Sequence, residues 1–467
     1  MLGGRLGRPK QRSVRRVRTG ADGEKGAASK LSRRWGLLLS ELGSPANRSP
    51  AIRLLFWVLL QAIIVNVVIA AVRLPDAFWV LTPWSSTPRA TFDSWRPIAD
   101  AVRSVTDHGG AGLYQRVYFE SSHQFTYSPQ SLALFDLVER AGLVSWGNYA
   151  ALNVVSQLVL LTVGVCAGLA QRSMSLGESL SLGGAVPCIL LGLVTTFLFY
   201  PAIRGFELGQ IQTWLTLLLT LAIWAHAAGR KLTAGVLLGL LMIVKPYYAL
   251  ALLWALLSGE RRVLAGQLAV LTATTGLSVA LYGFPIHVEF VDLLGALGRR
   301  GESFHANQSL AGLLHRAVFN GNNLVWDPWH RSTPELGWVN AVSRSWGLGW
   351  VLAALIAARK GDRRTGLWLV LVTTLVASPV AYEHYYALCI PIFIALGLHA
   401  LREGRLSIRT LLLASSFIVA GNFLGLTRSL AASRWNVFQS GLFFAGVTLL
   451  LLLHVHHARA AREGAPA

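Results

Sequence analysis

The chain has 467 residues, 53% of them hydrophobic, and a mean hydropathy of +0.49. Its many apolar runs have about 17–25 residues, the length at which a helix crosses a bilayer, and this argues against a soluble enzyme. The 42 Lys and Arg residues outnumber the 22 Asp and Glu residues. Many of them lie in short connections between apolar runs, a pattern that indicates a polytopic membrane protein and argues against nucleic-acid binding.

The two ends of the chain differ from its centre. Residues 1–50 carry many Lys and Arg residues and few apolar ones, a composition that predicts a disordered basic cytoplasmic tail attracted to anionic lipid headgroups. Residues 458–467 contain Arg459 and Arg462, and we expect a second short cytoplasmic tail there. The integral-membrane domain is then predicted to span residues 51–457.

Apolar runs predict an all-α polytopic membrane protein with ten full crossings. In chain order the predicted crossings cover residues 52–72, 147–170, 184–203, 211–228, 263–284, 342–358, 365–378, 384–401, 409–427 and 437–456.

One further apolar run, residues 232–258, is interrupted by Lys245-Pro246 and has basic residues at both ends. Proline breaks a helix, and basic ends indicate the cytoplasmic side. We therefore expect a hairpin of two half-helices that enters and leaves on that side. A single kinked crossing is the alternative.

This topology leaves two long loops on the outer side, residues 73–146 and 285–341. Aromatic residues and apolar patches in the first loop predict short helices that lie in the membrane interface. Trp326, Trp329 and Trp338 in the second loop are typical of anchors at headgroup level.

Polar residues that are candidates for chemistry gather on the predicted outer side, while a single lysine lies at membrane depth. Each has a structural alternative, such as a helix cap, a loop charge or an interfacial aromatic. Lys245 is the hardest to explain structurally, because an ionisable group in the bilayer is costly. No Cys-x-x-Cys, His-Glu-x-x-His or Asp-x-Asp motif occurs, so we expect no metal site. The candidates are Asp93, Tyr127, Arg204, Glu207, Gln210, Lys245, Asn307, Gln308 and His384.

The order of these motifs, across residues 52–450, resembles that of the polyprenol-phosphate-mannose-dependent mannosyltransferases of actinobacteria. These are integral-membrane glycosyltransferases of the GT-C class, in glycosyltransferase family 87. Glu207 departs from the family pattern, which more often has a neutral amide before the Gly-Gln pair. The motifs are Asp93, Leu113-Tyr114, Phe125-Thr126-Tyr127-Ser128-Pro129, Gly209-Gln210, Gly235, Gly239, Lys245-Pro246, Asn307-Gln308-Ser309-Leu310, Ser378-Pro379 and His384-Tyr385.

The resemblance implies a GT-C bundle of about 10–12 transmembrane helices, in a multi-pass protein of the plasma membrane with an extracytoplasmic active site. It implies transfer of a mannosyl residue from polyprenyl-phosphate-mannose to a glycolipid or glycan acceptor, with membrane lipids as the surroundings and no cofactor.

The expected roles of the residues follow from an inverting displacement. Asp93 is the expected base, and His384 is expected to be catalytic at the leaving phosphate. Lys245 and Arg204 are expected to bind the donor phosphate. We expect sugar or acceptor binding by Tyr127, Glu207, Gln210, Asn307 and Gln308.

Two other functions stay open. One is an arabinofuranosyltransferase with a decaprenyl-phosphate donor. The other is a transporter or flippase of lipid-linked sugars, because broken helices at membrane depth also occur in transporters.

Overall fold

The computed structural model describes residues 50–71, 92–121, 124–175, 182–299, 301–327, 333–359, 361–404, 406–422 and 425–463. The predicted basic tail up to residue 49 and Trp329 lie outside them. Within these ranges every regular element is helical, and the only strand-like pairing is an isolated bridge between Asn307 and Tyr382. The predicted all-α polytopic membrane fold is confirmed.

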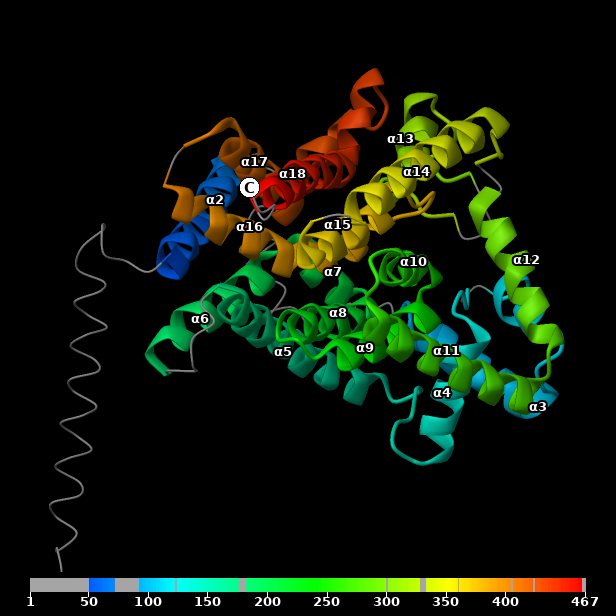
Figure 1. The fold of residues 1–467 in the computed structure, drawn as a ribbon. Helices are drawn as coiled ribbons and strands as arrows, with labels where there is room; N and C mark the ends of the chain where they lie inside the picture. The colour runs from blue at the N-terminus through cyan, green and yellow to red at the C-terminus, as the bar shows by residue number, and fades with distance from the viewer. Residues whose placement is uncertain are drawn as a thin grey trace, which may run out of the picture. The chain divides into compact units, whose positions relative to one another are not determined.

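The first half of the chain forms one group of packed helices, drawn in teal and green in Figure 1. Within it, α5 packs on α6 and α8, α8 packs on α9, and α9 packs on α11. In chain order the elements are α2 (Pro50–Ala71), α3 (Trp95–His108), η2 (Gln115–Phe119), α4 (Pro129–Arg140), α5 (Tyr149–Ser175), α6 (Leu182–Leu198), α7 (Tyr200–Glu207), α8 (Gln212–Ala227), α9 (Lys231–Val244), η3 (Pro246–Ala249), α10 (Leu250–Leu257) and α11 (Arg261–Tyr282).

The second half forms the yellow, orange and red group in Figure 1, and α2 packs on both groups, through α6 of the first and α16 of the second. The two groups meet where α7 and α8 pack on η4 and where α10 packs on α15. These elements are α12 (Pro285–Arg299), α13 (Leu310–Ala317), α14 (Gly337–Ala358), α15 (Arg363–Val376), η4 (Glu383–Cys389), α16 (Ile390–Glu403), α17 (Ile408–Gly421), η5 (Gly425–Leu430), η6 (Arg434–Ser440) and α18 (Gly441–Glu463).

Each predicted crossing corresponds to a helix or to two consecutive helices. In the described part of the chain, six helices are long and apolar enough to cross a membrane, or seven if a bent pair counts as one span. Helices α8, α15 and α17 have only 16, 14 and 14 residues. At 1.5 Å per residue they cover about 21–24 Å, less than the usual hydrocarbon thickness.

Proline breaks the predicted crossing 184–203 in two. Helices α6 and α7 meet at an angle of 61°, and Phe199 between them is extended, with φ −89° and ψ 108°. Pro201, in the first turn of α7, has no amide hydrogen to donate back into α6. The bend turns α7 toward η4 and places its polar residues beside His384.

The segment at 231–260 forms the predicted hairpin. Lys245 is extended because the residue before a proline avoids the helical region, and the chain turns there into η3 and α10. The two ends of the hairpin meet, since Lys231 Nζ lies 3.2 Å from Glu260 Oε1. A single kinked crossing would hold these ends about 30 Å apart. The predicted fold-back of this segment into a hairpin is therefore confirmed, Lys245 lies at its tip, and its entry from the cytoplasmic side stays a prediction.

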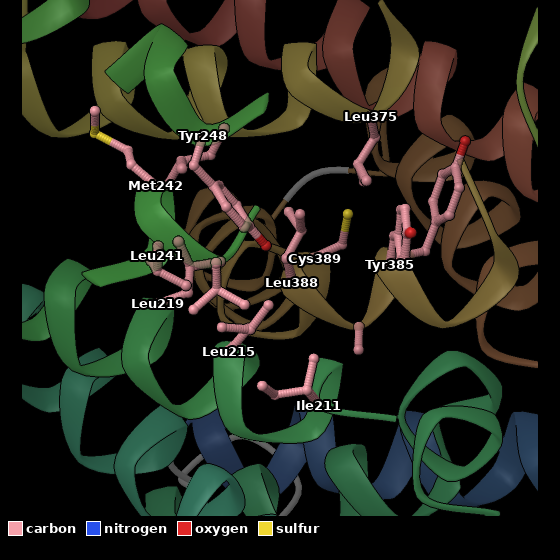
Figure 2. Close-up of a cluster of buried hydrophobic side chains, with 14 of the residues drawn as sticks. Ile211, Leu215, Leu219, Leu241, Met242, Tyr248, Leu375, Tyr385, Leu388 and Cys389 are labelled. Carbon is pink, nitrogen blue, oxygen red and sulfur yellow. The ribbon is translucent and has the colours of Figure 1, made fainter. Parts of the chain in front are cut away.

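Glycines let α9 and α11 pack in close contact. A Cβ atom on Gly235 would collide with the Val263 carbonyl, and one on Gly266 would lie 2.6 Å from the Leu232 carbonyl oxygen. Beside this contact, apolar side chains of α8 pack on η4. Figure 2 shows Leu215 of α8 near Leu388 of η4, and Tyr248 of η3 between Met242 and Leu388. This apolar packing fixes the hairpin tip relative to η4.

The first long loop contains α3, η2 and α4, so the prediction that this loop forms short helices is confirmed. Helix α3 is amphipathic, and its buried face includes Trp95, Ile98 and Val102. Asp93 lies two residues before this helix, so α3 carries the predicted base on a packed element.

Candidate active site

The segment that carries Asp93 is held by the loop after α7. The Asp93 amide donates to the Leu208 carbonyl at 3.0 Å, and the Ser94 amide donates to the Gly209 carbonyl at 3.3 Å. Gly209 has φ +60°, and a Cβ atom there would lie 3.0 Å from Phe92 Cα. Glycine is the residue that tolerates both the left-handed backbone and this close approach. The Gly209-Gln210 motif therefore places the Asp93 backbone.

Gln210 orients the Asp93 carboxylate. Its side-chain nitrogen donates to Asp93 Oδ2 at 3.3 Å, and its side-chain oxygen accepts from Ser94 Oγ at 2.9 Å. Asp93 is exposed, while Ser94 is fully buried. An acid in this setting is open to an incoming group on one side and held by the protein on the other.

Ser94 connects Asp93 to the hairpin tip. Besides donating to Gln210, its hydroxyl accepts from the Ile211 amide at 2.9 Å and from the Tyr127 hydroxyl at 2.7 Å. Burial raises the pKa of Tyr127, an effect that the Lys245 ammonium only partly opposes. Tyr127 is therefore a protonated donor at neutral pH, and its hydroxyl is committed to Ser94.

Lys245 places a positive charge between two tyrosines. Its Nζ lies 5.1 Å from the ring centre of Tyr127 and 4.8 Å from that of Tyr385, and it donates to the Tyr385 hydroxyl at 3.1 Å. The residue is 8% exposed. Among the described residues no carboxylate lies within ion-pair distance of it. A buried ammonium without an acid is suited to an anionic ligand.

Arg204 lies on α7 beside two acids. Its guanidinium is 3.5 Å from Glu207 Oε2 and 3.9 Å from Glu383 Oε2. Glu383 also accepts a hydrogen bond from the Tyr200 hydroxyl at 2.7 Å. Arg204 is therefore already partly neutralised, which makes it a weaker anion ligand than Lys245.

His384 is buried on η4 against α7. Its ring stacks on Tyr382 with an interplanar angle of 11°, and a Cβ atom on Gly205 would lie 3.4 Å from its Cβ. The next residue, Tyr385, accepts a hydrogen bond from Lys245, and Gly205 follows Arg204 in the chain. The structure thus brings His384 close to both predicted phosphate ligands.

Asn307 and Gln308 hold the neighbouring loop to the start of η4. The Gln308 amide donates to the Ala381 carbonyl at 2.6 Å, and the Asn307 side-chain oxygen accepts from the Ala381 amide at 3.2 Å. The Gln308 side-chain nitrogen donates to the His305 and Gln439 carbonyls, while its oxygen accepts from the first amides of α18. All of its hydrogen-bonding capacity is used inside the protein, so Gln308 has no free atom for a sugar.

Sequence reasoning did not identify Ser94 and Tyr385 as site residues, although both adjoin residues that it did identify. Sequence reasoning also did not identify a structural arginine beside the Asn307 loop, Arg316 on α13, which is fully buried and donates to the carbonyls of Ser303, Phe304 and Asn307. Burial lowers the pKa of Arg316 to about 10, so it stays charged at neutral pH. No local pattern marks an arginine whose partners are distant carbonyl groups.

The site therefore joins Asp93, Gln210, Tyr127 and Lys245 through hydrogen bonds and a cation–π contact, with Arg204, Glu207 and His384 beside them. Among the described residues no group of three or more His, Cys, Asp or Glu side chains is arranged to hold a metal ion.

The chain is similar in sequence to known proteins. The sequence profile of Glycosyltransferase family 87 matches residues 125–381. A protein of Mycobacterium tuberculosis (strain CDC 1551 / Oshkosh), named polyprenol-phosphate-mannose-dependent alpha-(1-2)-phosphatidylinositol pentamannoside mannosyltransferase, is 28% identical over 295 residues. The alignment covers 62% of this chain and 62% of that protein.

A protein of the same name from Mycolicibacterium smegmatis (strain ATCC 700084 / mc(2)155) is 28% identical over 311 residues. That alignment covers 64% of this chain and 68% of the relative. No solved structure matches the chain.

Proposed function

The chain belongs to glycosyltransferase family 87, and on this premise we propose that it transfers a mannosyl residue from polyprenyl-phosphate-mannose to a glycolipid acceptor. The names of the two mycobacterial relatives support this donor and an acceptor of the phosphatidylinositol mannoside type. Lys245 is the observation that carries the proposal, because a buried ammonium without an acid beside it suits a lipid-linked phosphate.

In the proposed reaction Asp93 is the base. The acceptor hydroxyl loses its proton to the Asp93 carboxylate while its oxygen forms a bond to the anomeric carbon of the donor sugar. The bond from that carbon to the phosphate oxygen breaks with its electron pair, releasing polyprenyl phosphate. The exposure of Asp93 and its hydrogen bond from Gln210 support this role, because a base needs access to the proton and a fixed orientation.

Lys245 is the proposed main ligand of the leaving phosphate. Negative charge accumulates on the phosphate as the bond breaks, and a fixed cation in a site shielded from water stabilises it more than a cation in bulk solvent. His384 and Arg204 are proposed to contribute from η4 and α7. The leaving group is a monophosphate, so the proposal includes no metal ion.

Glu207, Gln210 and Asn307 are the proposed contacts to sugar or acceptor hydroxyls. The Tyr127 hydroxyl and the Gln308 amide are engaged within the protein, and we propose that these two residues position the site rather than bind sugar. The position of the basic connections supports an active site on the outer face of the plasma membrane.

Incubation of the purified protein with labelled polyprenyl-phosphate-mannose and a panel of phosphatidylinositol mannosides tests the proposal. We expect one acceptor to become a mannosylated product of inverted anomeric configuration. Decaprenyl-phosphate-arabinofuranose serves as the competing donor, and product from that donor alone would assign an arabinofuranosyltransferase. Movement of the lipid-linked sugar across a vesicle membrane without any transfer would assign a flippase.

A further inference from the structure

A groove of about 440 Å³ lies between α2, α16 and α17, and α6 contributes to its wall. Its lining is mainly apolar and includes Leu54, Trp57, Phe393, Ile394 and Phe417. Figure 1 shows α2, α16 and α17 together at one edge of their group. The volume lies within the range of about 300–1,000 Å³ that is typical of small-molecule sites.

One end of this groove is basic. Arg53 lines the groove, and a smaller hollow that shares Ala400, Thr410 and Leu413 with it is lined by Arg409. Ion pairs between described residues include neither Arg53 nor Arg409.

The other polar groups of the smaller hollow largely satisfy each other. They are His399, Glu403, Ser407 and His456. The Glu403 carboxylate lies 3.1 Å from His399 Nε2, and the His399 ring lies 4.7 Å from that of His456. The two arginines therefore leave a net positive charge at this end of the groove.

The basic end of the groove is far from the candidate active site. Gly397, Ala400 and Gly404 line it at the C-terminal end of the span Glu383–Glu403, whereas His384 lies at the other end of that span. Twenty residues of helix at 1.5 Å each extend about 30 Å, the thickness of the hydrocarbon core. One lipid phosphate cannot occupy both ends, so a lipid held here is not a donor bound at Lys245.

We propose that this groove is a binding site for an anionic phospholipid, whose phosphate lies at Arg53 and Arg409 and whose acyl chain lies along Trp57, Phe393 and Phe417. Basic pockets between transmembrane helices bind anionic headgroups, and the cytoplasmic leaflet, where the basic connections are predicted, supplies them. The apolar wall contributes by burying the methylene groups of the chain. The site goes beyond the proposed transfer reaction and does not depend on it.

Lipid titration of the delipidated full-length protein in detergent, followed by native mass spectrometry, tests this site. Phosphatidylglycerol and phosphatidylcholine with identical acyl chains are compared. We expect phosphatidylglycerol to bind at least about tenfold more tightly, as one charge-assisted contact would give. Arg53→Gln combined with Arg409→Gln should remove this preference, and Ala414→Phe, which fills the groove, should weaken both lipids. Arg261→Gln, which removes a charge on α11 outside the groove, is the matched control.

Any one of the following results would overturn the proposal. Equal affinity of the wild-type protein for the two lipids is one, and an unchanged preference in the double arginine variant is another. The third is displacement of phosphatidylglycerol by polyprenyl phosphate, which would assign the groove to the donor tail. If the double variant does not fold, Ala414→Phe decides alone, because unchanged binding in that variant excludes the groove.

Discussion

Replacement of Lys245 by methionine separates the two roles that a buried lysine can have. Methionine keeps most of the length and volume of the side chain but removes the charge and the hydrogen bond to Tyr385. If Lys245 binds the donor phosphate, the variant loses transfer. If Lys245 stabilises the fold, the variant loses stability.

The expected loss of transfer follows from one charge-assisted contact. A hydrogen bond to a charged group contributes about 1.5–3 kcal/mol. If the variant loses this contact in the transition state, its kcat should fall by about tenfold to a hundredfold. Lys245→Arg should recover only part of the rate, because the planar guanidinium does not reproduce the position of the ammonium.

The expected change in stability is small. Burying the ammonium costs several kcal/mol. One hydrogen bond of about 1.5–3 kcal/mol and two ring contacts of about 0.5–2 kcal/mol each offset this cost to a similar extent. We therefore expect the free energy of unfolding of Lys245→Met to stay within about 2 kcal/mol of the wild-type value.

The assay measures transfer from labelled polyprenyl-phosphate-mannose and thermal unfolding on the same preparation. Lys231→Met is the matched control, because Lys231 lies at the base of the same hairpin and pairs with Glu260. It should lower the melting temperature while largely retaining kcat. A wild-type kcat in Lys245→Met would show that Lys245 does not bind the donor phosphate. A lower kcat accompanied by a large loss of stability would assign Lys245 a structural role instead.

Three further predictions concern the hydrogen bonds, the hairpin base and metal dependence. Ser94→Ala leaves the buried Ile211 amide without its acceptor. The variant should lose about 1–3 kcal/mol of stability in thermal unfolding and should show a lower kcat in the transfer assay. Wild-type stability and kcat would remove Ser94 from the site. Glu260→Gln removes the acid shared by Lys231 and Arg363, which are 25% and 58% exposed. It should cost about 1–3 kcal/mol in chemical unfolding, less than a fully buried pair, with donor KM unchanged. Transfer should continue in excess chelator, and a loss that manganese or magnesium restores would contradict the proposed leaving-group chemistry.

Much of the fold follows from local sequence signals. Apolar runs of membrane length predict the helices, and Lys245-Pro246 between two basic ends predicts the hairpin that the contact between Lys231 and Glu260 confirms. The bend between α6 and α7 was not predicted. Pro201 marks it in the sequence, but the run 184–203 is predominantly apolar and therefore resembles one crossing.

The site could be predicted in part. The contacts join Asp93, Gln210, Tyr127 and Lys245, and sequence reasoning identified all four. Gln308 shows why the rest could not be assigned. Its amide is engaged by Gln439 and by the start of α18, more than 130 residues away, and no local pattern distinguishes such an amide from one that binds sugar.

Transfer by Asp93→Asn measures directly whether Asp93 is the catalytic base. The asparagine side chain is similar in shape and keeps an oxygen that accepts from Gln210, but it is far too weak a base to take a proton. A general base contributes about 10²–10⁴ in rate. We expect Asp93→Asn to lose transfer from polyprenyl-phosphate-mannose by that factor at an unchanged melting temperature. Asp107→Asn, which changes an exposed acid on the last turn of α3, should keep full activity. Retention of more than about a tenth of the wild-type rate by Asp93→Asn would contradict the role of Asp93 as the base.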